Sequence, residues 1–371
     1  MIISYSVFLR FCFFKMRFLS YIFAFQKLYD MIQFQCDYNE GAHPRILERM
    51  MKTNFEQTPG YGEDEYCAKA KELIKSVIGR EDVDVHFLVG GTQTNATVIS
   101  SVLRPHQGVL CVKSGHINVH ETGAIEHGGH KVLALDGENG LLSAESIRKA
   151  MEDHLAEAGP EHTVQPGMVY ISFSSEVGTI YSLKQLEEIS AVCHEYALPL
   201  FIDGARMGYG LASEGCDVTI QDIARLADVF YIGGTKQGAL FGEAVVITNE
   251  ALKKDFRYYI KQNGGMLAKG RLLGIQFMTL FEDGLYFELS DHAVSLALKI
   301  RDAFKSKGYD FLAESPSNQQ FPILPNEVMN RLSSDFMFSV WQKVDETRTA
   351  VRFCTSWATR PEAVDLLISA I

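Results

Sequence analysis

Four short segments of the chain carry side chains of the kinds used in catalysis, and each follows a run of apolar residues. They are residues 90–95 (GGTQTN), His116, Asp203 and Lys236. Glycines and hydroxyls ahead of a helix can bind a phosphate through backbone N–H groups and the helix dipole. Residues 90–95 match neither GxxxxGK[ST] nor GxGxxG, so a plain strand-to-helix turn is the alternative interpretation.

Asp203 and Lys236 each allow a structural and a chemical interpretation. A carboxylate at a buried strand end is costly unless a cation pairs with it, so Asp203 could pair with Arg206. It could instead stay ionised and bind a protonated ring nitrogen. Burial lowers the pKa of a lysine, as an imine-forming lysine requires, although the long stem of Lys236 could also reach solvent. A lone histidine such as His116 is more often a packing or capping residue than a catalyst.

The combination of the four segments is more specific than any one of them. A phosphate cradle, a histidine and a D-x-A-R carboxylate are followed about thirty residues later by a lysine. A phosphorylated pyridine cofactor needs these parts. The cradle takes the phosphate, the histidine stacks on the ring, the carboxylate pairs with the ring nitrogen and the lysine forms the imine.

The elements that position these residues are short apolar strands alternating with helices. We expect strands at residues 83–91, 108–115, 131–136, 168–174, 199–205, 228–236 and 242–248. This alternation predicts βαβ units and a mostly parallel sheet buried on both faces. In such sheets ligands bind beyond the carboxyl ends of the strands, so the four segments should meet at one edge.

The pattern changes after about residue 255, and we expect two domains beyond an unusual leader. Residues 31–255 would form a large α/β domain, and residues 256–371 a smaller α+β domain. The smaller domain should contain a helical stretch over residues 266–308, strands at 336–344 and 350–357, and a final helix from Pro361.

Residues 1–30 are rich in aromatic and aliphatic side chains but are interrupted by Arg10, Lys15 and Arg17. They fit neither a membrane span of about twenty apolar residues nor a secretory signal. We expect translation to start at Met31, with a weak membrane-associating helix as the alternative.

Composition excludes several classes of protein. Of 371 residues, 47% are hydrophobic and 22% charged, which is typical of a soluble globular protein. The net charge of -11 argues against a nucleic-acid binder. Seven scattered cysteines without a CxxC pair indicate free thiols in a reducing compartment, so we expect a cytoplasmic protein. The pair His116 and His120 lacks the glutamate of HExxH, so we expect no metal.

These motifs resemble the fold-type-I pyridoxal-phosphate enzymes of the β-eliminating lyase and threonine aldolase family. The resemblance runs from about Phe34 to the C-terminus. It rests on YGED at residues 61–64, GGTQTN, GHI at 115–117, IDGAR at 202–206, and GGTK with the following GALFGEAVV. It implies an α/β fold, with a mostly parallel central sheet flanked by helices and a smaller C-terminal domain.

The resemblance also implies roles for individual residues. Lys236 would hold the cofactor covalently, Asp203 would pair with the ring nitrogen, and His116 would stack on the ring. The phosphate would be held by Gly91, Thr92 and Gln93. The remaining positions concern the substrate carboxylate: Arg206 (also near the cofactor's phenolic oxygen), Arg352, and Cys36 where some aldolases have a serine.

The implied reaction is aldol cleavage of a β-hydroxy-α-amino acid, L-threonine or L-allo-threonine, to glycine and an aldehyde. A β-eliminating lyase acting on another amino acid is the alternative. The intact Lys236 and Asp203 argue against a catalytically silent relative. Gly208-Tyr209-Gly210 lacks the third glycine of a dinucleotide site. The base for the hydroxyl proton stays open, with His116, His120, Glu121 and a water held by Glu176 as the candidates.

The resemblance further implies a homodimer or homotetramer with the site at a subunit interface. Lys261 and Lys269 would then reach the phosphate of a neighbouring subunit. Neither a membrane nor a nucleic acid is expected as a partner.

Overall fold

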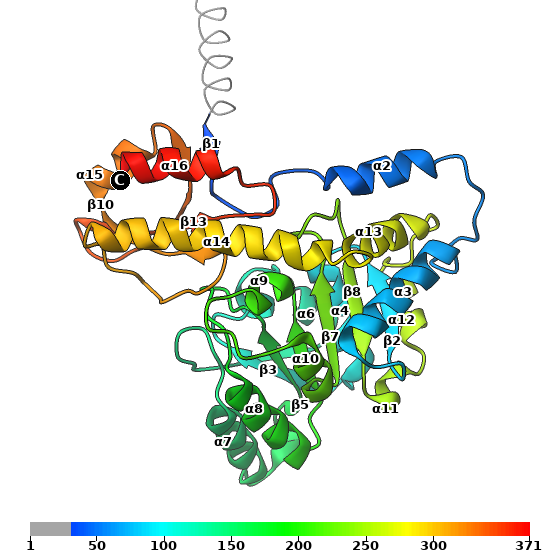
Figure 1. Cartoon of the computed structure of the whole chain (residues 1–371). Helices are drawn as coiled ribbons and strands as arrows, with labels where there is room; N and C mark the ends of the chain where they lie inside the picture. Colours follow the sequence, from blue (N-terminus) through cyan, green and yellow to red (C-terminus); the bar gives the residue numbers. More distant parts are fainter. Residues whose placement is uncertain (1–30) are drawn as a thin grey trace, which may run out of the picture.

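Within residues 31–371, which a computed structural model describes, the central sheet has seven strands in the order β2-β8-β7-β6-β5-β3-β4 (Figure 1). β8 runs antiparallel to both of its neighbours, and the other pairs are parallel. The predicted mostly parallel sheet is therefore confirmed, and the expectations for residues 1–30 lie outside the described part. The strands are β2 (Asp84–Leu88), β3 (Gln107–Val112), β4 (Lys131–Leu135), β5 (Gln165–Ser172), β6 (Leu200–Asp203), β7 (Val229–Gly233) and β8 (Glu243–Ile247).

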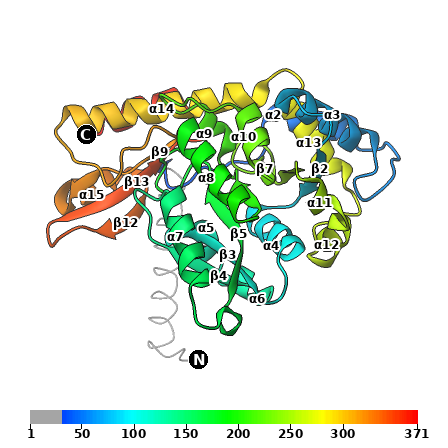
Figure 2. The same ribbon diagram turned by 90° about the horizontal axis from the view of Figure 1, so that it is seen from below.

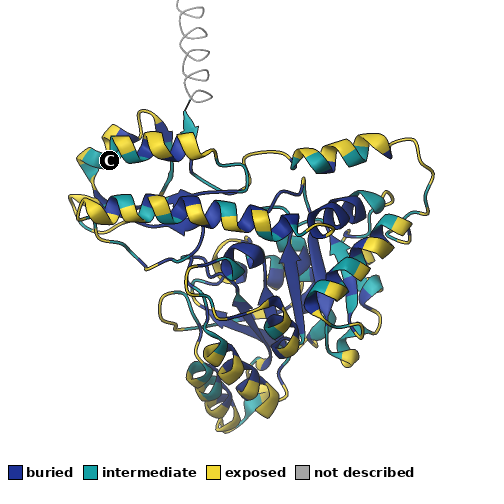
Figure 3. Cartoon of the chain, in the orientation of Figure 1, coloured by how far each residue is buried: buried dark blue, intermediate teal, exposed yellow. Residues whose placement is uncertain are grey.

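Helices cover both faces of this sheet (Figure 2). Successive residues of β5 alternate between the faces: Val169 and Ile171 pack in one core cluster and Tyr170 in the other. Because both faces are covered, the inner strands β6, β7 and β8 are buried along their whole length, whereas the edge strands β2 and β4 are only partly buried (Figure 3). One face packs against α3 (Glu65–Ile78), α7 (Ala144–Leu155), α8 (Leu183–Glu195) and α10 (Ile220–Leu226), and the other against α4 (Gly91–Val102), α5 (His116–Val119), α6 (Ala124–His127) and α12 (Phe256–Gln262).

The C-terminal part is joined to the large α/β part by α14 (Leu285–Ser306), which runs across both (Figure 1). Its antiparallel sheet has the order β10-β13-β12, and β9 pairs with the end of β13. The strands and the final helix expected there are confirmed. These elements are β9 (Gln319–Gln320), β10 (Ile323–Pro325), α15 (Asn326–Leu332), β11 (Phe336–Met337), β12 (Ser339–Lys343), β13 (Arg348–Cys354) and α16 (Pro361–Ala370).

The helical stretch expected over residues 266–308 is two helices, α13 (Arg271–Phe281) and α14. Gly284 separates them because it adopts a left-handed φ of 74°. In residues 31–371, no helix combines the length and the apolar character needed to cross a membrane. The remaining elements are β1 (Ile32–Gln33), α2 (Pro44–Lys52), η1 (Pro160–His162), α9 (Met207–Leu211) and α11 (Glu250–Lys253).

Two core clusters show which parts of the molecule α13 and the N-terminal segment pack against. Phe277 of α13 packs with the core of the large α/β part, although it follows residue 255. Phe34 packs instead in the C-terminal cluster, with ring centroids 6.4 Å from Phe336 and 6.2 Å from Phe353. The boundary at residue 255 stays a prediction, while the N-terminal segment and the C-terminal elements share one core.

We predict that Phe34→Ala destabilises the protein by about 3–5 kcal/mol, because it leaves a cavity among aromatic rings. Leu366→Ala is the control, since that side chain is 57% exposed and should change stability by less than about 0.5 kcal/mol. Urea unfolding measures both. Equal small effects would show that the N-terminal segment contributes little to the C-terminal core.

Candidate active site

A cavity of about 330 Å³ lies at the carboxyl edge of the parallel strands. Six of the residues predicted from the sequence line it: Gly91, Thr92, His116, Asp203, Arg206 and Lys236. They follow β2, β3, β6 and β7, so the expected meeting of strand ends at one edge is confirmed. The side chains of Gln93, Cys36 and Arg352 do not line this cavity.

Asp203 ends β6 and is 4% exposed. Its Oδ1 accepts hydrogen bonds from the Tyr231 hydroxyl and from Ala205 N (2.9 Å). Its Oδ2 accepts from the Tyr170 hydroxyl (2.5 Å) and from Asn95 Nδ2 (3.0 Å). Burial opposes ionisation, but the charge of His116 and these hydrogen bonds outweigh it and lower the pKa of Asp203. The site therefore holds a carboxylate that stays charged.

Sequence reasoning missed Asn95, Tyr170 and Tyr231 as functional residues. The two tyrosines lie within apolar strands and read as core residues. The only sequence signal for the two tyrosines is a hydroxyl within an apolar run, because a buried tyrosine needs a hydrogen-bond partner.

Lys236 follows β7, in a loop that hydrogen bonds hold in place. The Tyr209 hydroxyl donates to Lys236 O (2.5 Å). Burial and the nearby Arg206 lower the pKa of the Lys236 amine. An uncharged amine is the form that reacts with a carbonyl group.

Glu243 supports the lysine loop and was also missed. Because β8 is antiparallel, its first residue lies at the site edge, opposite Gly233. The Glu243 carboxylate accepts from Gly234 N (3.1 Å) and from Thr235 Oγ1 (2.9 Å). Burial raises the pKa of Glu243. The glutamate of GALFGEAVV is the signal that could have found it.

The residues predicted as an anion cradle lie at the N-terminus of α4, and their binding of a phosphate stays a prediction. The backbone N–H groups of Gly91 and Thr92 lie in its first turn, where helix donors have no partner within the helix. A Cβ added at Gly90 would meet no atom within 4 Å. The Gln93 side chain points elsewhere: it accepts from Val89 N (3.1 Å) and donates to Asn263 O (3.0 Å). Its role as a phosphate ligand stays a prediction.

His116 begins α5 and is held by a buried carboxylate. Its Nδ1 hydrogen bonds with Glu121 Oε1 (2.7 Å), which also accepts from Asn95 Nδ2 (2.7 Å). Asn95 therefore links the histidine's partner to Asp203. The His120 ring lies 5.5 Å from the His116 ring, between centroids. Residues 31–371 contain no group of three or more potential metal ligands arranged to hold a metal ion.

Glu176 and Ser174 follow β5 and line the cavity. Glu176 Oε1 accepts from His116 N (3.0 Å) and Ser172 Oγ (2.8 Å). Within residues 31–371, Glu176 Oε2 and Ser174 Oγ are buried without hydrogen-bond partners. Buried polar atoms without partners are rare, and these two belong to residues that line the cavity.

Arg206 forms a buried, bidentate ion pair that the sequence did not reveal. Its Nε and Nη2 donate to Asp37 Oδ2 and Oδ1 at 2.7 and 3.0 Å. Asn318 Nδ2 donates to the same carboxylate (2.9 Å). Burial opposes ionisation of Asp37, but the charges of Arg206 and Lys236 and the hydrogen bonds lower its pKa to about 2. The carboxylate thus fixes Arg206 at the cavity wall.

Arg352 also contacts the N-terminal segment that contains Asp37. Its Nη2 donates to Gln35 O (2.8 Å), and its guanidinium lies 5.3 Å from the Trp341 ring centroid. The Cys36 thiol donates to Asn39 Oδ1 (3.0 Å). The substrate roles of Arg352 and Cys36 stay predictions.

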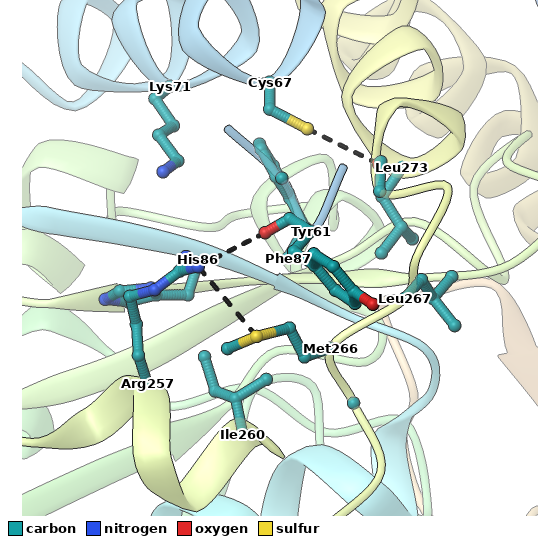
Figure 4. Close-up of a pocket in the computed structure, with 13 residues that line it drawn as sticks. Tyr61, Cys67, Lys71, His86, Phe87, Arg257, Ile260, Met266, Leu267 and Leu273 are labelled. Carbon is teal, nitrogen blue, oxygen red and sulfur yellow. Dashed lines mark hydrogen bonds between the residues drawn. The ribbon is translucent and has the colours of Figure 1, made fainter. Parts of the chain in front are cut away.

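A second cavity, of about 30 Å³, lies between α3, β2 and α12 (Figure 4). Arg257 Nη2 donates to Tyr61 O (3.4 Å), and the Cys67 thiol donates to Gly270 O (3.4 Å). Burial and the nearby Lys71 and Arg257 lower the pKa of His86 to about 3. A volume this small admits only water-sized molecules, so this second cavity cannot hold an amino acid or a cofactor.

The larger cavity fits pyridoxal phosphate by the chemistry of its walls. Unpaired helix N–H groups and the space beside Gly90 suit a phosphate. The ionised Asp203 suits a protonated ring nitrogen, and the lowered pKa of the Lys236 amine suits reaction with an aldehyde.

Comparisons with known proteins agree with this chemistry. A family model described as Beta-eliminating lyase matches residues 33–320. A low specificity L-threonine aldolase of a Pseudomonas species is 30% identical and covers 91% of this chain and 96% of its own. The solved Leishmania major threonine aldolase is 45% identical, with a TM-score of 0.89, and covers 91% of this chain and 98% of its own. Thermus thermophilus aspartate aminotransferase, 13% identical over 92% of this chain and 91% of its own with a TM-score of 0.67, shares the fold, so the expected fold-type-I architecture is confirmed.

Gly90→Val should weaken binding of pyridoxal phosphate, because the added side chain would occupy the space beside the helix N-terminus. Losing one hydrogen bond to a charged group costs about 1.5–3 kcal/mol, so affinity should fall by about 10–100-fold. A titration followed by absorbance measures this. The backbone at Gly90 is extended, so the melting temperature of the cofactor-free protein should not change. Unchanged affinity would show that the phosphate does not bind beside Gly90.

Asp37→Asn should destabilise the protein by about 3–5 kcal/mol, because it leaves the buried Arg206 charge without its partner. The folded-state pKa of Asp37 is lowered to about 2 from 3.8, so its stabilisation is present above pH 4 and is lost as pH falls toward 2. The difference in unfolding free energy between wild type and variant should therefore shrink by about 2 kcal/mol between pH 4 and 2.

Urea unfolding at several pH values measures this difference. Asp283→Asn is the matched control, because its ion pair with Arg45 is exposed and should contribute less than about 1 kcal/mol. A difference that stayed constant with pH would contradict the assignment of a low pKa to Asp37.

Proposed function

Because this chain belongs to the β-eliminating lyase family of pyridoxal-phosphate enzymes, we propose that it cleaves β-hydroxy-α-amino acids to glycine and an aldehyde. L-threonine and L-allo-threonine are the proposed substrates, as the names of the relatives suggest. The observation that carries the proposal is the convergence of Asp203, Lys236, His116 and the α4 N-terminus on one cavity.

The residues of the site divide the work of the reaction. Pyridoxal phosphate, when bound, draws electrons away from Cα of an attached amino acid. Asp203 supports this because its charge keeps a ring nitrogen protonated. The lowered pKa of Lys236 favours the amine form that reacts with an aldehyde, and the Tyr209 hydroxyl and the loop bonded to Glu243 hold its backbone in place.

The substrate carboxylate is proposed to bind between two arginines. Arg206 and Arg352 both hold the segment of residues 35–37, through Asp37 and Gln35 O. Tyr38, next in this segment, lines the cavity. A guanidinium can bind a carboxylate with two parallel hydrogen bonds, which orients the Cα–Cβ bond.

A second copy of the chain is proposed to complete the phosphate site. Among the described residues that line the cavity, the charged cations are Lys236 and Arg206, and Arg206 is paired with Asp37. Lys261 and Lys269 are exposed, as are the aromatic rings of Tyr61 and Tyr258. We therefore propose a homodimer or homotetramer in which these lysines approach the phosphate bound by a neighbouring subunit. We also propose that the protein is located in the cytoplasm. Gel filtration of the active enzyme as a monomer would contradict this.

The proposed activity predicts that the purified, cofactor-loaded protein releases acetaldehyde from L-threonine or L-allo-threonine. Lys236→Ala should abolish both this release and the yellow colour of the bound cofactor, because no amine remains to hold it. A coupled aldehyde assay and the visible spectrum measure the two effects. The ratio of the two substrate rates gives the preference at Cβ.

The conservative Lys236→Arg is the matched control, because it keeps the positive charge but cannot form the bond to an aldehyde. It should be as inactive as Lys236→Ala. A yellow wild-type protein that releases no aldehyde would instead favour a β-eliminating lyase acting on another amino acid.

A further inference from the structure

We propose that Glu176 is the catalytic base that removes the proton from the β-hydroxyl of the substrate. The inference rests on the proposed function, because a β-hydroxy-α-amino acid presents this hydroxyl. It assigns the base for the hydroxyl proton, which the sequence motifs leave open.

Position excludes two of the four candidate groups. His120 and Glu121 do not line the cavity. The Glu121 side chain is fully buried, and its Oε1 accepts hydrogen bonds from His116 Nδ1 and Asn95 Nδ2. Glu121 therefore acts as a positioning residue for His116 and does not touch the substrate.

The other two candidates were His116 and a water held by Glu176, and both of these residues line the cavity. The Nδ1 of His116 is engaged by Glu121. The Glu176 carboxylate is oriented through one oxygen only: Oε1 accepts from His116 N (3.0 Å) and Ser172 Oγ (2.8 Å). Oε2 has no partner in residues 31–371. Two hydrogen bonds thus hold the carboxylate through Oε1, while Oε2 is buried without a donor, so a small rotation of the carboxylate is needed for it to meet a substrate hydroxyl.

The surroundings suit a base. A hydroxyl of the substrate would satisfy Oε2, and a buried oxygen without a partner otherwise costs free energy. Ser174 Oγ, also without a partner, lines the same wall. Burial raises the pKa of Glu176, and a carboxylate with a raised pKa is a stronger base than an exposed one.

The proton and electron count of the step is balanced. The substrate O–H bond breaks as a bond between the proton and Oε2 forms, and the freed electron pair becomes the second C–O bond of the aldehyde. The Cα–Cβ pair remains with Cα, which takes up one proton to give glycine. One proton leaves oxygen and one joins carbon, so the step needs no oxidant or reductant.

Glu176→Gln tests the proposal, because the amide oxygen can still accept from His116 N and Ser172 Oγ but the group is no longer a base. Cleavage of L-threonine should slow by at least about 100-fold, the usual contribution of a general base. Glu176→Asp should retain more activity than Glu176→Gln. Glu152→Gln, at an exposed glutamate of α7, should cleave like the wild type.

Glycine separates a base from a structural residue, since it has no β-hydroxyl. In Glu176→Gln, the affinity for glycine, titrated by the visible spectrum, and the exchange of its Cα proton for deuterium, followed by NMR, should equal those of the wild type.

Three results would overturn the proposal. Undiminished cleavage by Glu176→Gln would exclude Glu176 as the base. Equal losses of cleavage, glycine affinity and exchange would make its role structural. If the wild type exchanged glycine protons but released no aldehyde, the proposed function itself would fail, and this inference with it.

Discussion

The negative charge of Asp203 lies inside the central sheet, and much of the site is built to keep it there. Two tyrosine hydroxyls, one amide side chain and one backbone N–H surround the carboxylate. These donors come from strands β5 and β7 on either side of β6, from α4 and from the turn after β6. A carboxylate in such surroundings would otherwise become neutral. The network continues through Asn95 and Glu121 to His116.

A second buried charge pair joins parts of the chain that are distant in sequence. Asp37 comes from the N-terminal segment, Arg206 from the large α/β part and Asn318 from the C-terminal part. Phe34, three residues before Asp37, packs in the C-terminal core. The segment that brings Asp37 to the cavity is therefore held at one end by apolar packing and at the other by charge. Such a pair adds little net stability but defines where Arg206 lies.

The opposite pKa shifts of Lys236 and its neighbours have one cause. Burial favours the neutral forms, so it lowers the pKa of the lysine and raises that of Glu243. Asp203 and Asp37, equally buried, remain charged because several donors and cations face each of them. Groups with raised and with lowered pKa values thus lie close together, as proton transfer and charge stabilisation both require.

The sequence by itself determined the fold class and the strand ends whose polar residues, Asp203, Lys236, His116 and the turn before α4, line one cavity. These are local properties: an apolar run, a following polar residue, and a turn rich in glycine. The tertiary structure decided which side chains meet them. From the sequence, Tyr170 and Tyr231 are expected to be core residues. In the structure, strand register places their hydroxyls beside Asp203. The Gln93 side chain points away from the cradle, and Asp37 reaches Arg206 across 169 positions. Hydrogen bonds between distant residues depend on how strands pair and where loops cross, and no local pattern encodes that geometry.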